Sequence, residues 1–359
     1  MITMRYGQRA IVALFAVAVN GCALIGIDRI PPEVSRFPSL AGKFAERFAV
    51  GAAVEPTQLD SAEGSLLRWH FNSVVAENAM KPPRVQPAEG RFDFSGADRI
   101  VEFAERRGMK VRGHTLLWHE ETPQWYWEGA NGAPASGDQV LERLRRHIRA
   151  VVGRYRGRIY AWDVVNEVVD YTRPDCLRDD RWLRVVGPRY IEQAFRYAHE
   201  ADPAAKLFVN DYDTTEPRKR ACLERVVKEL LARGVPLHGV GHQMHVDLDK
   251  PSGTELDETL TRFAALGLEN QVTELDLTLG AHAAGADGEL LARQAARYEE
   301  LFAVFVRHPD VKAVTFWGIS DAHTWRNAGR AACTDQPLLF DAGQRPKPAY
   351  FAVARETPP

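Results

Sequence analysis

The sequence predicts an α/β protein with a single-domain (β/α)8 TIM barrel, and two observations support this fold class. From residue 48 onward, eight short segments rich in apolar and β-branched residues alternate with longer segments whose apolar residues recur at i, i+3 and i+4. Such alternation indicates a parallel sheet covered by helices. Eight repeats over roughly 310 residues fit a closed barrel with enlarged loops. No G-x-G-x-x-G turn follows the first strand, which argues against a doubly wound dinucleotide-binding sheet.

The expected elements follow one another along the chain. The predicted strands span residues 48–54, 72–77, 110–118, 159–168, 206–210, 239–246, 270–277 and 311–320. The clearest helical patterns between them span residues 97–107, 139–154, 218–233 and 289–306. Residues 128–137 and 281–287 are rich in glycine and alanine and are predicted as loop insertions after the third and the seventh strand.

The chain begins with the pattern of a secretory signal. Arg5 and Arg9 precede an uninterrupted apolar run, which is the charge-then-apolar layout of an export signal. The run ends in Val-Asn-Gly-Cys, which resembles a bacterial lipoprotein cleavage site with an unusual Asn. Residues 1–22 are therefore expected to be a lipoprotein-type signal, with Cys22 as the lipidated first residue of the mature protein.

Two alternatives to lipidation of Cys22 remain open. One is ordinary signal cleavage. The other is retention of the apolar run as a membrane anchor, because it continues to Ile27 with one polar break and barely reaches the length that about 30 Å of hydrocarbon requires. All three alternatives predict an exported protein, secreted or lipid-anchored, facing the periplasm or the outer cell envelope. Residues 23–37 are expected to form a short linker, and residues 38–359 the barrel domain.

Composition and charge exclude two broad classes of protein. Hydrophobic residues make up 45% of the chain, which suits a large packed core and not a disordered protein. The formal net charge is −2, and Lys and Arg alternate with Asp and Glu, so no basic stripe predicts a nucleic-acid partner. The expectation is a monomer that needs no cofactor.

The three cysteines beyond the signal predict neither a metal site nor a disulfide framework. Cys176, Cys222 and Cys333 are widely spaced, with no C-x-x-C pair and no histidine at metal-ligand spacing. One pair could form in an oxidising compartment, but sequence separation does not select it.

Two glutamates at predicted strand ends are the candidate catalytic residues. Barrel enzymes carry their chemistry at the C-terminal ends of the strands. The fourth strand ends in Asn166-Glu167, and the seventh carries Glu274 and Asp276 on one side. Strands four and seven lie on opposite sides of the barrel, so Glu167 and Glu274 face each other across its mouth. Retaining glycosidases use two carboxyls about 5–5.5 Å apart, although each Glu alone would also fit a salt bridge to an arginine.

Other strand ends carry polar and aromatic residues of the kind that bind sugars. These residues are Glu77, Asn78 and Lys81 at the second strand, His114 and Trp118 at the third, Gln243 and His245 at the sixth, and Trp317 and Trp325 at the eighth. Each alone is compatible with core packing or with a buried structural histidine. Together they predict a carbohydrate-binding cleft, because hydroxyl groups need several hydrogen-bonding partners and sugar rings stack on aromatic faces.

Five ordered motifs carry a resemblance to a known family. They are Glu77-Asn78-Ala79-Met80-Lys81, Arg112-Gly113-His114-Thr115-Leu116-Leu117-Trp118-His119, Trp162-Asp163-Val164-Val165-Asn166-Glu167, Thr273-Glu274-Leu275-Asp276 and Thr315-Phe316-Trp317-Gly318-Ile319-Ser320-Asp321. With these motifs, residues 38–353 resemble glycoside hydrolase family 10, the retaining endo-β-1,4-xylanases.

The resemblance implies a role for each candidate residue. Glu167 would be the acid/base and Glu274 the nucleophile, while His245 and Asp276 would orient Glu274. Asn166 would bind the 2-hydroxyl of the sugar at the cleavage point. The expected substrate-binding residues on the non-reducing side are Glu77, Asn78, Lys81, His114, Trp118, Gln243 and Trp317, with Trp325 beside them.

The implied substrate is xylan or a xylo-oligosaccharide, and two alternatives differ from this reading. One is a retaining barrel glycosidase that acts on β-1,4-glucan or β-mannan. Lys81 and crowding by Trp317 and Trp325 favour a sugar without a hydroxymethyl group. The other is a barrel that binds polysaccharide without cutting it, although both carboxylates are present here.

The chain departs from the family pattern at a few places. Residue 324 is Thr where the family often has Ser, and three loops differ, at residues 128–137, 173–180 and 326–336. These departures leave the cleft length open.

Overall fold

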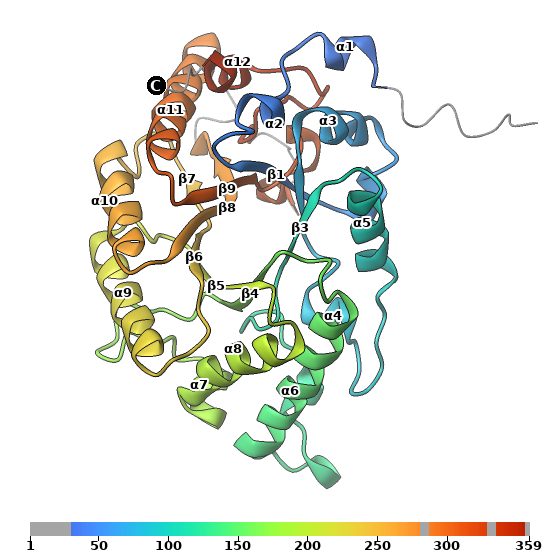
Figure 1. The fold of residues 1–359 in the computed structure, drawn as a ribbon, viewed down its shortest axis with the longest axis vertical. Helices are drawn as coiled ribbons and strands as arrows, with labels where there is room; N and C mark the ends of the chain where they lie inside the picture. The colour runs from blue at the N-terminus through green and yellow to red at the C-terminus, as the bar shows by residue number, and fades with distance from the viewer. Residues whose placement is uncertain (1–29, 281–286, 329–334, 356–359) are drawn as a thin grey trace, which may run out of the picture.

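The computed structural model describes residues 30–280, 287–328 and 335–355, and these form a closed barrel of parallel strands surrounded by helices (Figure 1). The barrel strands are β1 (Ala49–Val54), β2 (Ser73–Ala76), β3 (Lys110–Gly113), β4 (Ala161–Asn166), β5 (Lys206–Asp211), β6 (Gly239–His242), β8 (Glu269–Leu277) and β9 (Val311–Phe316). They pair in chain order, and β9 pairs with β1, which closes the ring. The predicted (β/α)8 fold class is therefore confirmed.

The helices cover the outside of the barrel. The longer ones are α3 (Ala62–His70), α5 (Ser95–Glu105), α6 (Gly137–Arg154), α8 (Arg189–Ala201), α9 (Pro217–Ala232), α10 (Gly253–Ala264), α11 (Gly288–Arg307) and α12 (Pro348–Arg355). The shorter ones are α1 (Pro32–Ser35), α2 (Leu40–Lys43), α4 (Pro82–Val85) and α7 (Arg181–Val186). The four helices predicted from periodicity are found within two residues of their expected ends.

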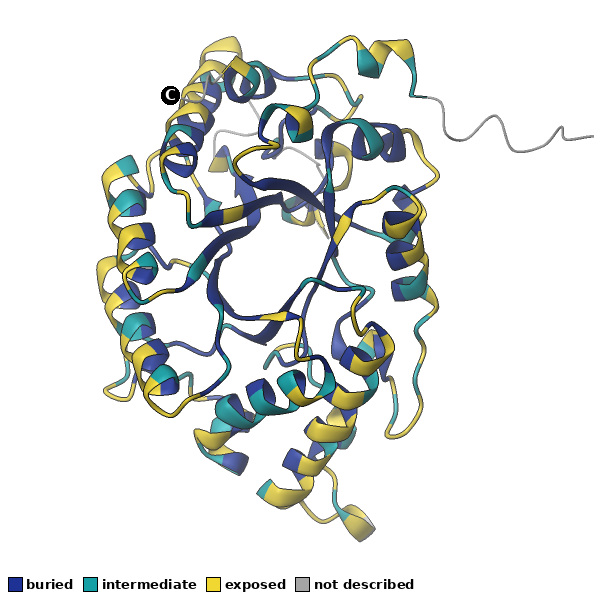
Figure 2. Cartoon of the chain, viewed as in Figure 1, coloured by how far each residue is buried: buried dark blue, intermediate teal, exposed yellow. Residues whose placement is uncertain are grey.

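Burial follows the layers of the fold. The strands are buried along nearly their whole length, whereas each outer helix exposes one face and buries the other against the sheet (Figure 2). The barrel interior is partly polar, because Arg112 lies inside it with an ion pair to Asp163 and a 2.6 Å hydrogen bond to Gln271. A Cβ on Gly113 would lie 2.1 Å from the Trp162 ring, so only glycine lets β3 and that ring pack together.

The sixth predicted strand is interrupted in the structure. Residues 239–242 form β6, the chain then turns at Gln243 and Met244, and His245–Val246 form the two-residue strand β7. Met244 has a φ of 61°, which a continuous strand does not allow. Within the described part of the chain, β7 pairs only with the end of β8, with His245 opposite Asp276. The predicted third strand is also shorter than expected, since its ladder ends at Gly113.

The described part of the expected linker packs on the barrel. Residues 30–37 include α1, and the Phe37 ring lies 6.0 Å from Tyr350 and 5.7 Å from Phe351. The expected signal with Cys22, Cys333 and most of the predicted insertion at 281–287 lie outside the described residues. Within the described part of the chain, no helix combines the length and apolar character needed to cross a membrane.

Candidate active site

Acidic and amide side chains from several strand ends meet at one mouth of the barrel. Glu167 follows β4, and Asn210 is the second-last residue of β5. Gln243 follows β6, and Glu274 lies on β8. The strands run parallel, so their C-terminal ends open on the same mouth. Sequence reasoning placed Glu167, Gln243 and Glu274 there, but it missed Asn210.

Three amides connect the carboxylates of Glu167 and Glu274. Gln243 Nε2 donates to Glu167 Oε1 and to Asn166 Oδ1, both at 3.2 Å. Asn210 Nδ2 donates to Asn166 Oδ1 at 2.8 Å and to Glu274 Oε1 at 2.7 Å. Among the described residues, neither carboxylate forms an ion pair with an arginine. The two glutamates therefore belong to one hydrogen-bonded network, and not to separate salt bridges.

Asn210 is held in the orientation that this network needs. Thr273 Oγ1 donates to Asn210 Oδ1 at 2.7 Å, which leaves the amide nitrogen directed at Glu274. A Cβ on Gly241 would lie 2.3 Å from the same Oδ1. The glycine on β6 therefore provides the space in which the Asn210 amide sits.

His245 bridges Glu274 and Asp276. Its Nε2 lies 3.1 Å from Glu274 Oε2, and its Nδ1 lies 3.0 Å from Asp276 Oδ2. Burial by itself would lower the pKa of His245, but the charges and hydrogen bonds of Asp276 and Glu274 outweigh burial and raise it to about 10. The imidazole is therefore a cation at neutral pH, and it lies next to the Glu274 carboxylate.

Arg326 and Trp325 hold Asp276 from the opposite side. Arg326 donates from Nε and Nη2 to Asp276 Oδ1 at 2.9 and 2.7 Å, and Trp325 Nε1 donates to Oδ2 at 2.7 Å. Burial would raise the pKa of Asp276, but the charges of His245 and Arg326 lower it below its ordinary value. A chain of alternating charges therefore runs from Arg326 through Asp276 and His245 to Glu274.

The backbone of Glu167 is fixed in an uncommon conformation. Its φ is 61°, in the left-handed region that residues other than glycine seldom adopt and that costs about 1 kcal/mol or more. Its amide donates to Asn210 O at 2.9 Å, and its carbonyl accepts from Arg178 Nε at 2.6 Å. These contacts turn the side chain toward the mouth of the barrel.

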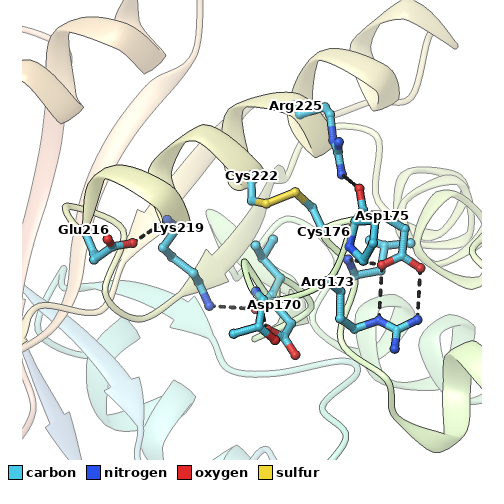
Figure 3. The surroundings of a disulfide bond; sticks show 12 residues. Asp170, Arg173, Asp175, Cys176, Glu216, Lys219, Cys222 and Arg225 are labelled. Atoms are coloured by element: carbon cyan, nitrogen blue, oxygen red, sulfur yellow. Dashed lines mark hydrogen bonds and ion pairs between the residues drawn. A yellow bond between two sulfur atoms is a disulfide. The ribbon is translucent and has the colours of Figure 1, made fainter.

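The loop after Glu167 is linked to α9 by a disulfide and by hydrogen bonds (Figure 3). A disulfide joins Cys176 in this loop to Cys222 on α9. Lys219 donates to Val169 O at 2.8 Å and forms a 2.7 Å ion pair with Asp211, and Arg225 donates to Pro174 O at 2.7 Å. The spacing of the cysteines left the choice of pair open, and the fold selects this one.

The disulfide is expected to stabilise the folded protein. Cys176 and Cys222 lie 46 residues apart, and closing a loop of this size typically contributes about 2–4 kcal/mol. The double variant Cys176→Ser, Cys222→Ser should lose about that much free energy of unfolding in urea titrations. The oxidised and reduced wild-type protein serve as controls, because reduction should reproduce the loss. An unchanged urea midpoint in the double variant would contradict the prediction.

The residues at the end of β2 form a second polar group. Lys81 Nζ donates to Asn78 Oδ1 at 2.8 Å, and Asn78 Nδ2 donates to Glu55 Oε1 at 2.7 Å. Lys81 Nζ also lies 5.1 Å from the centre of the Trp118 ring. Burial and the neighbouring charge of Glu55 raise the pKa of Glu77 to about 7. Glu55 was not predicted, although it directly follows the first strand.

Aromatic rings line the mouth between these two groups. Trp317 is buried, and its ring lies 5.3 Å from His114 and 6.3 Å from His245. His114 Nδ1 lies 3.0 Å from Asp163 Oδ2, which fixes the orientation of this imidazole. Trp325 is 45% exposed and lies 5.1 Å from His245. His114, Trp317 and Trp325 are therefore brought together with His245 on the Glu274 side of the mouth, whereas Trp118 lies beside Lys81.

The family model of Glycosyl hydrolase family 10 matches residues 39–356 of this chain. The chain belongs to glycosyl hydrolase family 10. The match begins directly before α2 and reaches the end of α12, so it includes the whole barrel.

Relatives in family 10 share about two residues in five with this chain. Endo-1,4-beta-xylanase B of Paenibacillus barcinonensis is 42% identical over 89% of this chain and 98% of its own length. The thermostable celloxylanase of Thermoclostridium stercorarium is 43% identical over 88% of this chain and 87% of its own length. The solved structure of TsXylA, an intracellular xylanase of Thermoanaerobacterium saccharolyticum in complex with xylotriose, is 41% identical with a TM-score of 0.82, covering 88% and 98% of the two chains.

This family 10 barrel also has a polar cavity beside His245. The cavity measures about 360 Å³ and lies between residues 213–217 and 244–251. It opens next to β5 and β6, which stand opposite β1 and β2 in the ring of strands. The cleft therefore has polar walls on both sides of the Glu167 and Glu274 pair.

Proposed function

We propose that this protein is an endo-1,4-β-xylanase that hydrolyses internal bonds of xylan and retains the anomeric configuration. The observation that carries the proposal is the network that holds Glu167 and Glu274 at one mouth of the barrel. The names of the relatives, and the xylotriose bound by one of them, support xylan as the substrate. Glu274 is the proposed nucleophile and Glu167 the proposed acid/base.

In the first step, Glu274 attacks the anomeric carbon while Glu167 donates its proton to the departing glycosidic oxygen. Asn210 and the His245 cation donate hydrogen bonds to the Glu274 carboxylate and hold it in position for the attack. The bond to the leaving chain breaks, and a glycosyl ester forms on Glu274. No metal or cofactor enters this step.

In the second step, water hydrolyses the ester. Glu167 gave its proton to the leaving oxygen in the first step, so it is now a carboxylate and can act as a base. Glu167 takes one proton from the water while the oxygen bonds to the anomeric carbon and Glu274 leaves as a carboxylate. Two inversions give net retention.

The remaining predicted residues are proposed to hold the sugars. Asn166 lies between the two carboxylates in the network, where it suits the 2-hydroxyl of the sugar at the cleavage point. Glu77, Asn78, Lys81, His114, Trp118, Gln243, Trp317 and Trp325 are proposed for the non-reducing side. The cavity beside His245 lies on the opposite side and suits the reducing-end part of the chain.

The proposal is tested by following the anomeric protons of a soluble xylo-oligosaccharide by NMR from the first seconds of digestion. β-Anomers that form before mutarotation, together with cuts at internal bonds, are the expected result. Initial α-anomers would show that Glu274 is not a nucleophile. Binding of the oligosaccharide without cleavage would support the alternative of a non-catalytic polysaccharide-binding barrel.

A second candidate substrate is β-1,4-glucan, because one relative at 43% identity is named a celloxylanase. Glucose units carry a hydroxymethyl group that xylose lacks. The buried Trp317 and the Lys81 amine beside the Trp118 ring leave the non-reducing side crowded. Comparison of kcat/KM on xylotetraose and cellotetraose distinguishes the two candidates, and a higher value on xylotetraose is expected.

Export of the protein and lipidation of Cys22 are also part of the proposal. The charged and apolar beginning of the chain and the Cys176–Cys222 disulfide support an oxidising compartment outside the cytoplasm. Family membership does not decide the location, since TsXylA is described as intracellular. Mass spectrometry of the mature N-terminus tests this part, because a lipid on Cys22 adds a defined mass.

Arg326 is expected to influence the pH dependence of the reaction. Replacing it with methionine removes a positive charge from the chain of residues that ends at Glu274. Arg326 is one of the charges that hold the pKa of Asp276 below its ordinary value. Its loss should raise that pKa, so Asp276 becomes protonated at a higher pH and the acidic limb of kcat/KM should move upward by about one pH unit. The measurement is a pH profile of kcat/KM on a xylo-oligosaccharide.

Two further variants separate the charge of Arg326 from its packing. Arg326→Lys keeps the charge and should leave the acidic limb near its original pH. Arg345→Met removes an arginine whose partner, Asp341, is a surface residue, and it should change nothing. A uniform loss of activity in Arg326→Met with an unmoved limb would show that Arg326 only packs against Asp276.

A further inference from the structure

His119, Glu120 and Glu167 meet beyond the C-terminal ends of β3 and β4. One nitrogen of His119 and one oxygen of each glutamate lie within 4.8 Å of one another. His119 Nε2 is 3.8 Å from Glu120 Oε1. A parallel bridge between Trp118 and Asn166 explains this proximity, because it places the residues that follow them side by side.

The ligand atoms of these three residues are only partly engaged within the protein. The hydrogen bonds that Asn166 and Gln243 donate to the Glu167 carboxylate both end on Oε1, so Oε2 is available. The 3.8 Å between His119 Nε2 and Glu120 Oε1 is too long for a hydrogen bond, so this contact leaves the nitrogen available to a metal ion. The Glu120 side chain is 62% exposed and can therefore rotate toward an ion at little cost.

We propose that His119, Glu120 and Glu167 form a binding site for a divalent transition-metal ion such as Zn²⁺. One imidazole and two carboxylates are a ligand set that zinc accepts, with water in the fourth position of its tetrahedron. Ca²⁺ and Mg²⁺ fit less well, because they prefer six or more oxygen ligands and avoid imidazole. The ligand atoms lie up to 4.8 Å apart, and rotation of the exposed Glu120 side chain brings its oxygen to metal-ligand distance.

Two cations limit the affinity of this site. Arg178 and Lys81 both lie close enough to act on the charge of Glu120. Arg178 donates hydrogen bonds to the carbonyl of Glu167 and to the Tyr212 hydroxyl, and these bonds keep its guanidinium near the site. The site is therefore weaker than a structural zinc site, and an ion there is exchangeable and not a permanent part of the protein.

The consequence of metal binding is inhibition of hydrolysis. A metal ion on Glu167 Oε2 prevents that carboxyl from carrying the proton of either step. This consequence rests on the proposed function of Glu167, but the binding of the ion does not. Sequence reasoning predicted no metal site, because it searched for cysteines and closely spaced histidines, and this site joins the ends of two strands.

The test is titration calorimetry with ZnCl₂ on the full chain and on two variants that lose the same charge. Glu120→Gln removes a proposed ligand, whereas Glu121→Gln neutralises the adjacent carboxylate, which lies outside the cluster. Wild type and Glu121→Gln should bind one zinc ion equally at this site. Glu120→Gln should weaken that binding by more than the roughly 10-fold that loss of an outer-shell partner costs.

Inhibition is measured in parallel on a xylo-oligosaccharide, with each variant compared with its own rate in EDTA. Zinc should inhibit wild type and Glu121→Gln at concentrations that leave Glu120→Gln unaffected. The proposal is overturned if Glu120→Gln binds zinc like wild type, or if both variants lose binding equally. Zinc that binds through Glu120 without slowing hydrolysis would remove Glu167 from the ligand set. If the protein cuts no xylan at all, the calorimetry still decides whether the site exists.

Discussion

Replacing Glu274 with alanine is expected to lower kcat/KM on xylo-oligosaccharides by a factor on the order of 10⁵, as when the nucleophile of a covalent enzyme is removed. Glu274 is 5% exposed, and Asn210 and His245 direct its two oxygens. Asp276 cannot replace it, because both of its oxygens are bound by Arg326, Trp325 and His245. Steady-state rates on xylotetraose check the size of the loss.

The chemical role of Glu274 is distinguished by rescue with azide. In Glu274→Ala, azide can occupy the space of the missing carboxylate and attack an aryl β-xyloside in one displacement. The expected product is an α-xylosyl azide, since one displacement inverts the configuration. Glu269→Ala is the matched control, because Glu269 begins the same strand and pairs with Lys206 at the surface. Loss of activity in Glu274→Ala without any azide product would indicate a folding or binding defect.

The fold and the positions of Glu167 and Glu274 at one mouth of the barrel were predictable because local rules decide them. Alternation of apolar segments with helical periods identified the eight strands, and Glu167 and Glu274 were conspicuous as charges at the ends of apolar strands. Asn210 carried the same signal, since it is a polar residue near the end of the apolar stretch Leu-Phe-Val. It was missed because burying an amide costs less free energy than burying a carboxylate, so an amide at a strand end is a weaker indication of function.

Other features depend on contacts that no sequence rule encodes. Arg326 reaches Asp276 from a loop 50 residues away, and no periodicity connects the two positions. The choice of Cys222 as the partner of Cys176 follows from the way α9 packs beside the loop after β4. The break between β6 and β7 follows from the backbone of Met244, a residue with no intrinsic preference for a positive φ. Each of these is a property of the assembled barrel.

Replacing Glu167 with alanine is expected to have an effect that depends on the leaving group. General acid catalysis typically contributes about 10²–10⁴-fold, so hydrolysis of xylotetraose should slow by roughly 10³-fold. A dinitrophenyl β-xylobioside departs without a proton, so its first step should remain fast. Glycosyl-enzyme would then accumulate, because no base activates the water. Stopped-flow release of dinitrophenol should show a burst followed by slow turnover.

Azide and a surface control complete this experiment. Azide needs no general base, so it should accelerate the slow turnover of Glu167→Ala and give a β-xylobiosyl azide, the product of two inversions. Glu142→Ala, on the exposed face of α6, should behave like wild type. Equal losses on both substrates would mean that Glu167 positions the sugar and does not transfer a proton. Opposite configurations of the azide products from Glu167→Ala and Glu274→Ala cannot arise from a general loss of structure, since each configuration requires a different carboxylate to remain functional.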